Sequence, residues 1–499
     1  MEKSTTLFEK FRETGKHGII YGIGSILQKV ISFALLPLYT TRFAASDYGI
    51  LGLVTITGTV ISMIFTVGLN VGLIRSYYDY KDEENRKSVL STAFYLALIS
   101  SLMLLIFGLV FSKDLSLLLF KSTNYRIHFI IIIVTSVFDI LNIIPFVIFR
   151  VKMKSVQFVI FQTAFLLLGI GLIVYLVNYA KLGILGSLIG NLAVSALTFF
   201  VFYIYFRKEI NFKFLKIEFK KMLLIGLPLI PSDISVFVFT AIDRYFLNYY
   251  STTRELGLYN LAYNFGNIIT VLLATPVSLI WPTMYLSAKD HDNAKEFYSR
   301  ALTYTLCISL FLFLVFGLLA REVLHIMSNK EYWDSYMVIP IIVMTYSLWS
   351  LRKIINVAVT LTRKVQGLAI INFIGAAINI GLNFLLTPKY GMMGAGFATL
   401  ITYIIVIVSM FFYNQRLMKL YYEWQRIIKI LIVTTAIFAL GYFIVINNLV
   451  FAILFKVLII LSYPFLLYFL RFFKEGEILR LKELYKSFIL KIRKRKNRA

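Results

Sequence analysis

Several charged residues lie deep inside apolar stretches of this sequence, where a charge is costly to place. Lys29 and Asp233 are each about halfway along an apolar run, 18–41 and 222–248, and Asp139 is near the middle of another. Charges in membrane-spanning helices usually mark the path of a substrate or an ion. An ammonium attracts an anion as a point charge, whereas a carboxylate binds H⁺ or Na⁺ or neutralises Lys29, so Asp233 and Asp139 are candidates for ion coupling. The alternative is a structural ion pair, or side chains that reach the membrane surface.

The runs that carry Lys29 and Asp233 also contain residues that break helices. Glycine and proline weaken or interrupt the backbone hydrogen bonds of a helix. Discontinuous helices at corresponding positions in a transporter commonly form its binding site. We therefore expect a substrate cavity beside these two runs. The breaking residues are Gly22, Gly24 and Pro37 in the first run and Gly226, Pro228 and Pro231 in the second.

Polar side chains recur every three or four residues in two other apolar runs, which places each set on one face of a helix. Thr59 and Asn267 are 208 residues apart, which is the offset of an internal repeat described below, so we expect the two stripes to line opposite walls of a cavity. The alternative is hydrogen bonding between helices, which contributes only about 0.6 kcal/mol per contact in membranes. The stripes are Thr55, Thr59, Ser62, Thr66 and Asn70, then Asn260, Asn264 and Asn267, and a third run adds Asn372, Asn379 and Asn383.

Arginines lie near the ends of several runs. Arg42 and Arg244 occupy similar places near the ends of the first and seventh runs. They either bind an anion on its way out, or they anchor helix ends and balance neighbours such as Asp243. Arg75 lies at the cytoplasmic end of the second run, where positive charge is expected in any case. The alternative is that Arg75 helps to load the substrate. Lys456, in the last run, is expected to be structural.

The composition is that of an integral membrane protein. Of the 499 residues, 59% are hydrophobic and 15% are charged, and the mean hydropathy is +0.80. The formal net charge is +26, but the basic residues are spread over short loops, so we expect no nucleic-acid partner. Cys307 is the single cysteine and no Cys/His cluster has the spacing of metal ligands, so neither a metal nor a cofactor is expected.

Fourteen apolar runs, each about 20 residues long, predict an all-α membrane protein with fourteen spans. When the N-terminus is placed in the cytoplasm, most of the 51 Lys and Arg residues fall in cytoplasmic segments, as the positive-inside rule requires. The first 17 residues are charged and lack the apolar core of a signal peptide. Both termini are then cytoplasmic. The predicted spans are 18–41, 49–74, 89–111, 127–149, 156–178, 183–206, 222–248, 257–286, 301–320, 336–357, 366–388, 393–415, 427–446 and 449–470.

The chain repeats itself at an offset of 208 residues, through matched segments that begin at Asp47 and Glu255, at Lys113 and Arg321, and at Lys181 and Lys389. Since six spans separate the copies, both halves enter the membrane in the same direction. This predicts two parallel six-helix lobes, or repeats, around a central cavity, with a C-terminal helix pair outside the repeat. The predicted segments are a cytoplasmic N-terminus 1–17, an N-terminal lobe 18–206, a cytoplasmic linker 207–221, a C-terminal lobe 222–415, additional helices 427–470 and a basic cytoplasmic tail 471–499.

The basic tail alternates apolar and basic residues at helical spacing. We expect it to lie as an interfacial helix on anionic membrane lipids. The alternative is a disordered tail that only reinforces the topology.

Several stretches resemble flippases of polysaccharide biosynthesis. They begin at Gly22 (GIGSILQKVISFALLPLYTTRF), Ser46 (SDYGI), Ile242 (IDRYF) and Glu255 (ELGLYN). The resemblance covers the whole chain and is to the O-antigen-type, lipid-linked oligosaccharide branch of the multidrug/oligosaccharidyl-lipid/polysaccharide exporter superfamily. Members of that superfamily have twelve or fourteen helices and rock two lobes around a central cavity.

The resemblance implies transport rather than catalysis. The implied substrate is an oligosaccharide joined by a diphosphate to a polyprenol. It is moved from the cytoplasmic to the outer leaflet of the bacterial cytoplasmic (inner) membrane for assembly of surface polysaccharide, with other polysaccharide-assembly proteins as candidate partners. The residues then expected to line the cavity are Lys29, Arg42, Thr59, Asn70, Arg75, Asp139, Asp233, Arg244, Asn264 and Asn267.

Three alternatives to this function remain. A lipid II flippase and a multidrug exporter share the superfamily, although the often cationic cargo of a drug exporter suits the basic residues poorly. A membrane polysaccharide polymerase or glycosyltransferase is less expected, because no nucleotide-binding glycine loop occurs in the cytoplasmic loops.

Transport of about two uncompensated negative charges gains roughly 4.6 kcal/mol from a 100 mV potential, so a coupling ion is not required.

Overall fold

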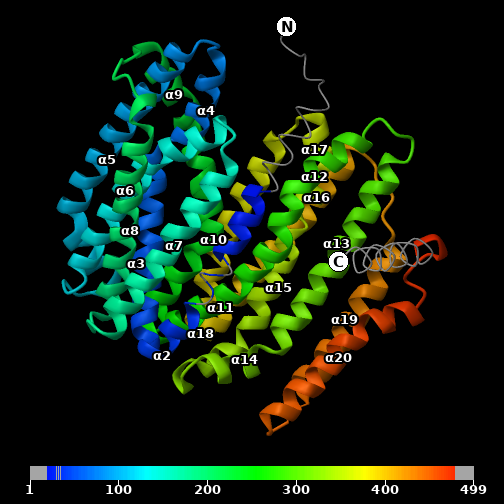
Figure 1. Ribbon diagram of the computed structural model, residues 1–499. Coiled ribbons are helices and arrows are strands. Elements are labelled where there is room, and N and C mark those ends of the chain that lie inside the picture. Colours follow the sequence, from blue (N-terminus) through cyan, green and yellow to red (C-terminus); the bar gives the residue numbers. More distant parts are fainter. Residues whose placement is uncertain (1–19, 30, 32, 34, 445, 478–499) are drawn as a thin grey trace, which may run out of the picture.

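The chain is almost entirely helical in the computed structural model, which describes residues 20–29, 31, 33, 35–444 and 446–477 (Figure 1). Two helical bundles stand side by side, and the last two long helices flank the second bundle. No strand occurs in these described residues. The predicted N-terminal segment 1–17 and most of the basic tail 471–499, with its interfacial helix, lie outside them.

The first bundle, which we call the N-lobe, is built from residues 20–206. Residues 20–29 are helical, α5 packs on α6, and α6 and α7 pack on α8. Helices suit a membrane because they satisfy every backbone polar group within the segment. The N-lobe helices are α2 (Leu36–Arg42), α3 (Ala45–Thr66), α4 (Leu69–Asp79), α5 (Glu83–Phe120), α6 (Arg126–Val151), α7 (Ser155–Asn178) and α8 (Gly183–Phe206).

The second bundle, which we call the C-lobe, is built from residues 230–417. Within it α10 packs along α18, and α11 and α13 pack on α15. Before it lie η1 (Arg207–Glu209), α9 (Lys216–Gly226) and η2 (Leu227–Leu229), and after it lie α19 (Trp424–Phe443) and α20 (Leu449–Phe469). The C-lobe elements are α10 (Ile230–Tyr250), α11 (Thr253–Ile269), the π-helical η3 (Thr270–Ala274), α12 (Thr275–Ala288), α13 (Ala294–Leu318), α14 (Ala320–Met327), η4 (Lys330–Met337), α15 (Ile339–Ser350), α16 (Arg352–Ile355), α17 (Val357–Thr362) and α18 (Gln366–Leu417).

In the described part of the chain, ten helices are long and apolar enough to cross a membrane, and two bent helix pairs bring the number to twelve. α18 counts once among them although it crosses twice, and the first predicted span is described only in parts. With α18 taken as two spans, the described residues account for up to thirteen of the fourteen predicted spans. The bent pairs are Lys216–Leu229 with Asp233–Tyr250, and Lys330–Met337 with Ile339–Thr362.

α18 is 52 residues long but is not one straight helix. Gly391 has φ 53° and ψ −132°, a conformation that glycine adopts at little cost. On either side of it the chain folds back, since Asn379 Nδ2 donates to Thr402 Oγ1 at 3.2 Å. A continuous helix of this length would extend about 78 Å, far more than the thickness of a bilayer. α18 is therefore two antiparallel spans joined by a tight turn.

The internal repeat is visible in the backbone of these turns. Gly183, between α7 and α8, has φ 55°, and Gly391 has φ 53°. The two glycines are 208 residues apart in the sequence. Equivalent helical hairpins in the two lobes thus turn at equivalent glycines, which confirms the predicted repeat.

The two lobes meet where α3 and α11 begin. A Cβ atom built on Gly49 would lie 2.2 Å from the carbonyl oxygen of Thr253, and one built on Gly257 would lie 1.8 Å from that of Ala45. Both pairs, Gly49 with Gly257 and Ala45 with Thr253, obey the 208-residue offset, so the contact is reciprocal. We call this end of the molecule the closed end. At the opposite end, α4 and α9 stand away from α12 and α17 (Figure 1).

The seventh span passes from one lobe to the other. Its first half, α9, packs on α4 and α5, whereas its second half, α10, packs on α18. The halves are bent by 42°, and the predicted helix breakers Pro228 and Pro231 lie at the bend. α9 already begins at Lys216, inside the predicted linker. An ion pair between Lys213 and Glu84 holds the preceding segment on the N-lobe.

The additional helices α19 and α20 are fastened to the C-lobe by buried polar contacts. Lys456 Nζ lies 2.6 Å from Glu322 Oε1 and donates to the carbonyl oxygen of Leu318 at 2.9 Å. The hydroxyl of Tyr463 donates to the carbonyl oxygen of Cys307 at 3.1 Å. Lys456 is therefore structural, as expected.

Replacing Gly257 with alanine should push α3 and α11 apart. The new methyl group would meet a backbone oxygen, which cannot move aside as a side chain can. Overpacking typically costs about 1–3 kcal/mol, so we expect a lower apparent unfolding temperature in detergent. Gly171→Ala is the matched control, because nothing lies within 4 Å of a Cβ at that position. Equal unfolding temperatures for the two variants would contradict the close approach of the helices.

Replacing Glu322 with glutamine should leave the ammonium of Lys456 buried without a counter-charge. Breaking a buried ion pair in this way costs about 3–5 kcal/mol, whereas replacing both partners by apolar residues is often neutral. We therefore expect Glu322→Gln to lower the apparent unfolding temperature, and Glu322→Leu combined with Lys456→Met to recover most of the loss. A double variant as unstable as the single one would show that the pair itself is not the cause.

Candidate functional site

A cavity of about 280 Å³ lies between the lobes, and we call it the central cavity. Lys29 of the first span reaches it, as do Asn264 and Asn267 of α11 and Tyr48 of α3. Asn264 Nδ2 donates to the Tyr48 hydroxyl at 2.7 Å, so this contact bridges the two lobes. The structure thus brings together three of the residues predicted for the site, one cation and two amides.

A second cavity, of about 540 Å³, lies inside the N-lobe, and we call it the N-lobe cavity. Asp139 of α6 lines it, and the Ser195 hydroxyl of α8 donates to Asp139 Oδ1 at 2.6 Å. Tyr39 lines both this cavity and the central cavity, so the two adjoin. The predicted stripe of the second span also faces it, through Thr55, Thr59, Ser62 and Thr66.

A third cavity, of about 320 Å³, lies in the C-lobe, and we call it the C-lobe cavity. Asn267 lines both this cavity and the central one. Thr59 and Ser62 of the N-lobe cavity correspond, at the 208-residue offset, to Asn267 and Thr270 here. The first stripe and Asn267 of the second therefore line corresponding cavities in the two lobes, rather than opposite walls of one cavity. Each of these cavities shares a lining residue with the central cavity.

The C-lobe cavity contains two basic residues that the sequence interpretation missed. Arg352 and Lys353 line it, and the guanidinium of Arg352 lies 3.9 Å from the ring centroid of Trp349. They lie in the middle of the helical segment Ile339–Thr362. Both residues fall inside the predicted apolar run 336–357. The same search for charges within runs that found Lys29 would therefore have found them.

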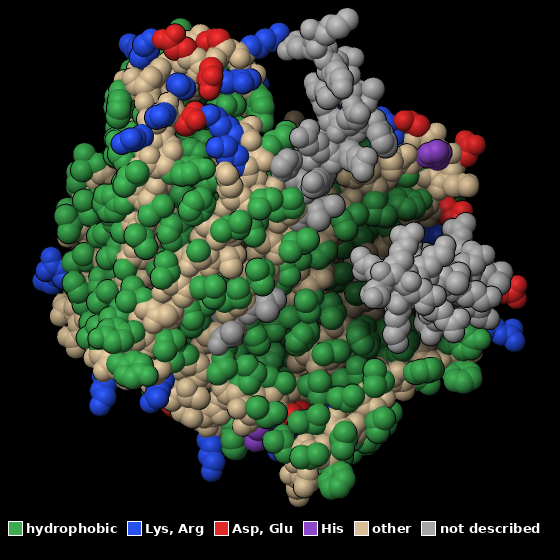
Figure 2. Space-filling view, in the orientation of Figure 1, with side chains coloured by type: hydrophobic (Ala, Val, Ile, Leu, Met, Phe, Trp, Pro, Cys, Tyr) green, Lys and Arg blue, Asp and Glu red, His purple; other side chains and the backbone are tan. Residues whose placement is uncertain are grey.

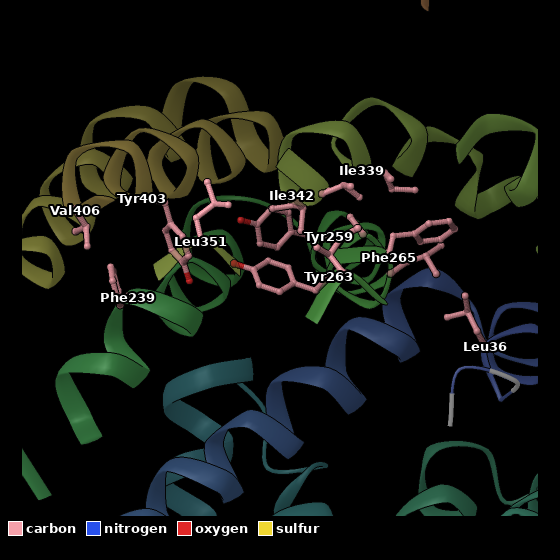
Figure 3. Packing of buried hydrophobic residues seen from close by; sticks show 14 of the residues in the cluster. Leu36, Phe239, Tyr259, Tyr263, Phe265, Ile339, Ile342, Leu351, Tyr403 and Val406 are labelled. Atoms are coloured by element: carbon pink, nitrogen blue, oxygen red, sulfur yellow. The ribbon is translucent and has the colours of Figure 1, made fainter. Parts of the chain in front are cut away.

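A buried carboxylate organises the core of the C-lobe next to these cavities. Asp243 is 1% exposed, and its Oδ2 accepts hydrogen bonds from the hydroxyls of Tyr259 at 2.7 Å, of Thr399 at 3.1 Å, and of Tyr263. Figure 3 shows the two tyrosines of α11 close to Tyr403 of α18. The Asp243 carboxylate on α10 thus links α10 to α11 and α18.

Arg244, a predicted site residue, is buried beside this carboxylate. Its guanidinium lies 3.7 Å from the ring centroid of Tyr263, an attractive cation–π contact. In the described part of the chain no ion pair joins it to a carboxylate, and only its backbone N–H donates to Asp243, at 2.9 Å. The ring of Tyr263 in turn lies 5.8 Å, centroid to centroid, from that of Tyr346, which lines the C-lobe cavity. The positive charge of Arg244 is therefore close to the polar path without lining it.

The other predicted residues lie apart from the cavities. Asp233 is exposed in the first turn of α10, Arg42 is exposed at the end of α2, Arg75 is exposed on α4, and Asn70 is partly buried near the start of α4. Within the described residues, none of these side chains makes an ion pair or lines one of the three cavities. In particular, Asp233 and Lys29 do not pair with each other in this conformation.

The asparagines of the eleventh span serve the packing of helices. Asn379 and Asn383 are fully buried, and Asn379 donates to Thr402 across the α18 hairpin. Asn383 donates to the carbonyl oxygen of Asn379 at 3.0 Å, and the hydroxyl of Thr387 donates to Asn383. The interhelical alternative therefore applies to Asn379, whereas Asn383 bonds within its own helix.

Comparison with known proteins identifies the family. The model of the family described as "Polysaccharide biosynthesis protein" matches residues 14–288. The Lsg locus putative protein 1 of Haemophilus influenzae is 23% identical over 285 residues, which cover 55% of this chain and 67% of that protein.

Solved structures show the same fold. The lipid II flippase MurJ, in an inward closed conformation, matches with a TM-score of 0.75 and 18% identity, over 90% of this chain and 99% of MurJ. An inward-facing multidrug resistance MATE transporter of the MOP superfamily matches with a TM-score of 0.65 and 13% identity, over 80% of this chain and 94% of the transporter. Because the family model covers more than half of the residues, this multi-pass membrane protein belongs to the polysaccharide biosynthesis protein family.

Proposed function

We propose that this protein is a flippase that moves a polyprenyl-diphosphate-linked oligosaccharide from the cytoplasmic to the outer leaflet of the bacterial inner membrane. The observation that carries the proposal is the position of Lys29, which faces a cavity between the lobes together with Asn264 and Asn267. An ammonium at this place matches a diphosphate, and amides match sugar hydroxyls. Membership of the polysaccharide biosynthesis family supports such a cargo.

The three adjoining cavities provide the polar surroundings that the headgroup requires. Hydrocarbon rejects both a sugar and a diphosphate, because neither finds hydrogen-bond partners there. The hydroxyls of the N-lobe cavity and the cations Lys29, Arg352 and Lys353 replace the lost water along one path. The polyprenol remains in the lipid, so no bond has to be made or broken and no catalytic group is needed.

Alternating access accounts for the arrangement of the lobes. They touch at the closed end through Gly49 and Gly257 and stand apart at the other end. We propose that the closed end faces outward, because the distribution of Lys and Arg puts both termini in the cytoplasm. The bend of the seventh span, between α9 on the N-lobe and α10 on the C-lobe, then lies where one lobe rotates against the other.

The membrane potential supplies a driving force for the proposed transfer. An inside-negative potential of 100 mV favours outward movement of two uncompensated negative charges by roughly 4.6 kcal/mol. Neutralisation by Lys29 reduces this gain, and an H⁺ or Na⁺ carried by Asp233 or Asp139 would then add to it. Anionic lipids and other polysaccharide-assembly proteins are further proposed partners.

Lys29→Ala should slow the transfer of a labelled polyprenyl-diphosphate oligosaccharide across reconstituted vesicles. A hydrogen bond to a charged group contributes about 1.5–3 kcal/mol, so we expect a loss of about ten-fold or more, with Lys29→Arg retaining most of the rate. The measurement is made with and without an imposed potential. Lys181→Ala, at an exposed turn, is the control and should transfer at the wild-type rate.

Lipid II and a cationic dye are tested in the same vesicles. Faster transfer of lipid II than of other lipid-linked glycans would assign the protein to the lipid II branch. Export of the dye by folded wild type, without transfer of any lipid-linked glycan, would refute the flippase.

A further inference from the structure

The N-lobe and C-lobe cavities correspond in position but differ in charge. Of the described residues that line the N-lobe cavity, Asp139 alone is charged. Those lining the C-lobe cavity include Arg352 and Lys353 and no carboxylate. Since equivalent stripes of α3 and α11 form one wall of each, the fold itself does not require this difference. The polar path is therefore negative at one end and positive at the other.

The N-lobe cavity offers hydrogen-bond acceptors and donors around an unneutralised carboxylate. In the described part of the chain, no Lys or Arg forms an ion pair with Asp139, and the Ser195 hydroxyl donates to its Oδ1 at 2.6 Å. An ionised carboxylate accepts several hydrogen bonds, and a hydroxyl that donates to a carbonyl of its own helix, as most of those lining this cavity do, still accepts one from a ligand. The remaining polar groups are those of Thr55, Thr59, Ser62, Thr66, Thr135, Ser136 and Asn191.

Apolar walls complete the cavity. Phe165, Ile132 and Ile173 lie among the polar groups, so one side of a ligand meets hydrocarbon while its edge meets hydroxyls. A sugar ring has this division, with C–H groups on its faces and hydroxyls around its edge. The volume of about 540 Å³ falls within the roughly 300–1,000 Å³ typical of small-molecule sites.

The charges that line the cavities determine which part of the headgroup can lie in each cavity. Tyr39 separates the N-lobe cavity from the central cavity, where Lys29 is the only charged residue among the described lining residues. A diphosphate at Lys29 would be kept out of the N-lobe cavity by Asp139, because like charges repel strongly in surroundings of low dielectric constant. The glycan, which continues from the diphosphate, then enters the N-lobe cavity.

We infer that the N-lobe cavity is the glycan site and that Asp139 makes it select neutral or amino sugars over uronic acids. This inference rests on the proposed flippase function and adds its substrate class. A carboxylate accepts hydrogen bonds from sugar hydroxyls and attracts a protonated amine. It repels the carboxylate of a uronic acid at the same position. Asp139 is thus a specificity residue, distinct from Lys29, which acts on the diphosphate common to all such substrates.

The test compares two substrates that share one polyprenyl diphosphate and one glycan length. One carries a neutral hexose next to the diphosphate, and the other carries the corresponding hexuronic acid. In reconstituted vesicles we expect wild type to transfer the neutral substrate at least about ten-fold faster. Asp139→Asn should reduce the ratio to about three-fold or less, mainly through faster transfer of the uronate. Asp290→Asn, the same substitution at an exposed site outside the cavities, should keep the wild-type ratio.

A second variant guards against misfolding of Asp139→Asn. Thr59→Asp adds a carboxylate to the same cavity and should increase the ratio. Equal transfer of both substrates by wild type would overturn the inference and leave the flippase intact. If Asp139→Asn slows the transfer of both substrates equally and keeps the ratio of their rates, the inference would also be overturned and Asp139 would be assigned to ion coupling. Transfer of neither substrate by folded wild type would instead refute the proposed function.

Discussion

The reciprocal contact between α3 and α11 is the constraint on which the arrangement of the molecule depends. Two glycines from equivalent positions of the repeat allow the two backbones to touch, and any larger side chain there would separate the lobes. This contact brings Tyr48 of one lobe to Asn264 of the other. Both residues line the central cavity, so the contact between the lobes helps to set the shape of that cavity.

The cost of placing charge in hydrocarbon explains most of what surrounds this contact. Charges with structural tasks are buried and partnered, as Lys456 is by Glu322 and Asp243 is by three hydroxyls. Lys29 of the central cavity and Asp139 of the N-lobe cavity, in contrast, lack an oppositely charged partner among the described residues. In a membrane protein such groups are costly unless a substrate, an ion or water reaches them.

The sequence predicted the fold well because hydropathy and repetition are properties of the chain itself. The all-helical membrane fold, the 208-residue repeat and the break near Pro228 followed from hydropathy and spacing. The stripes at Thr59 and Asn267 line corresponding cavities in the two lobes rather than opposite walls of one cavity. Spacing gives the depth of a residue and its helical face but not the tilt of the helix. This is why Asp233, placed correctly at a helix break, lies outside the cavities. Arg352 and Lys353 also lie within a predicted run, 336–357, and line the C-lobe cavity, but they were missed because charges inside that run were not considered.

Alternating access requires the two lobes to part at the closed end, and one cross-link tests this requirement directly. Asn329 Nδ2 donates to the carbonyl oxygen of Thr41 at 3.0 Å across the two lobes, and both residues are exposed. Cysteines at these two positions, in a Cys307→Ser background, allow the closed end to be locked and released. The account predicts that oxidation stops transfer of the lipid-linked oligosaccharide and that a reductant restores it, with the single cysteine variants unaffected. Full transfer by a completely cross-linked protein would show that the lobes do not have to part here, and would contradict the account.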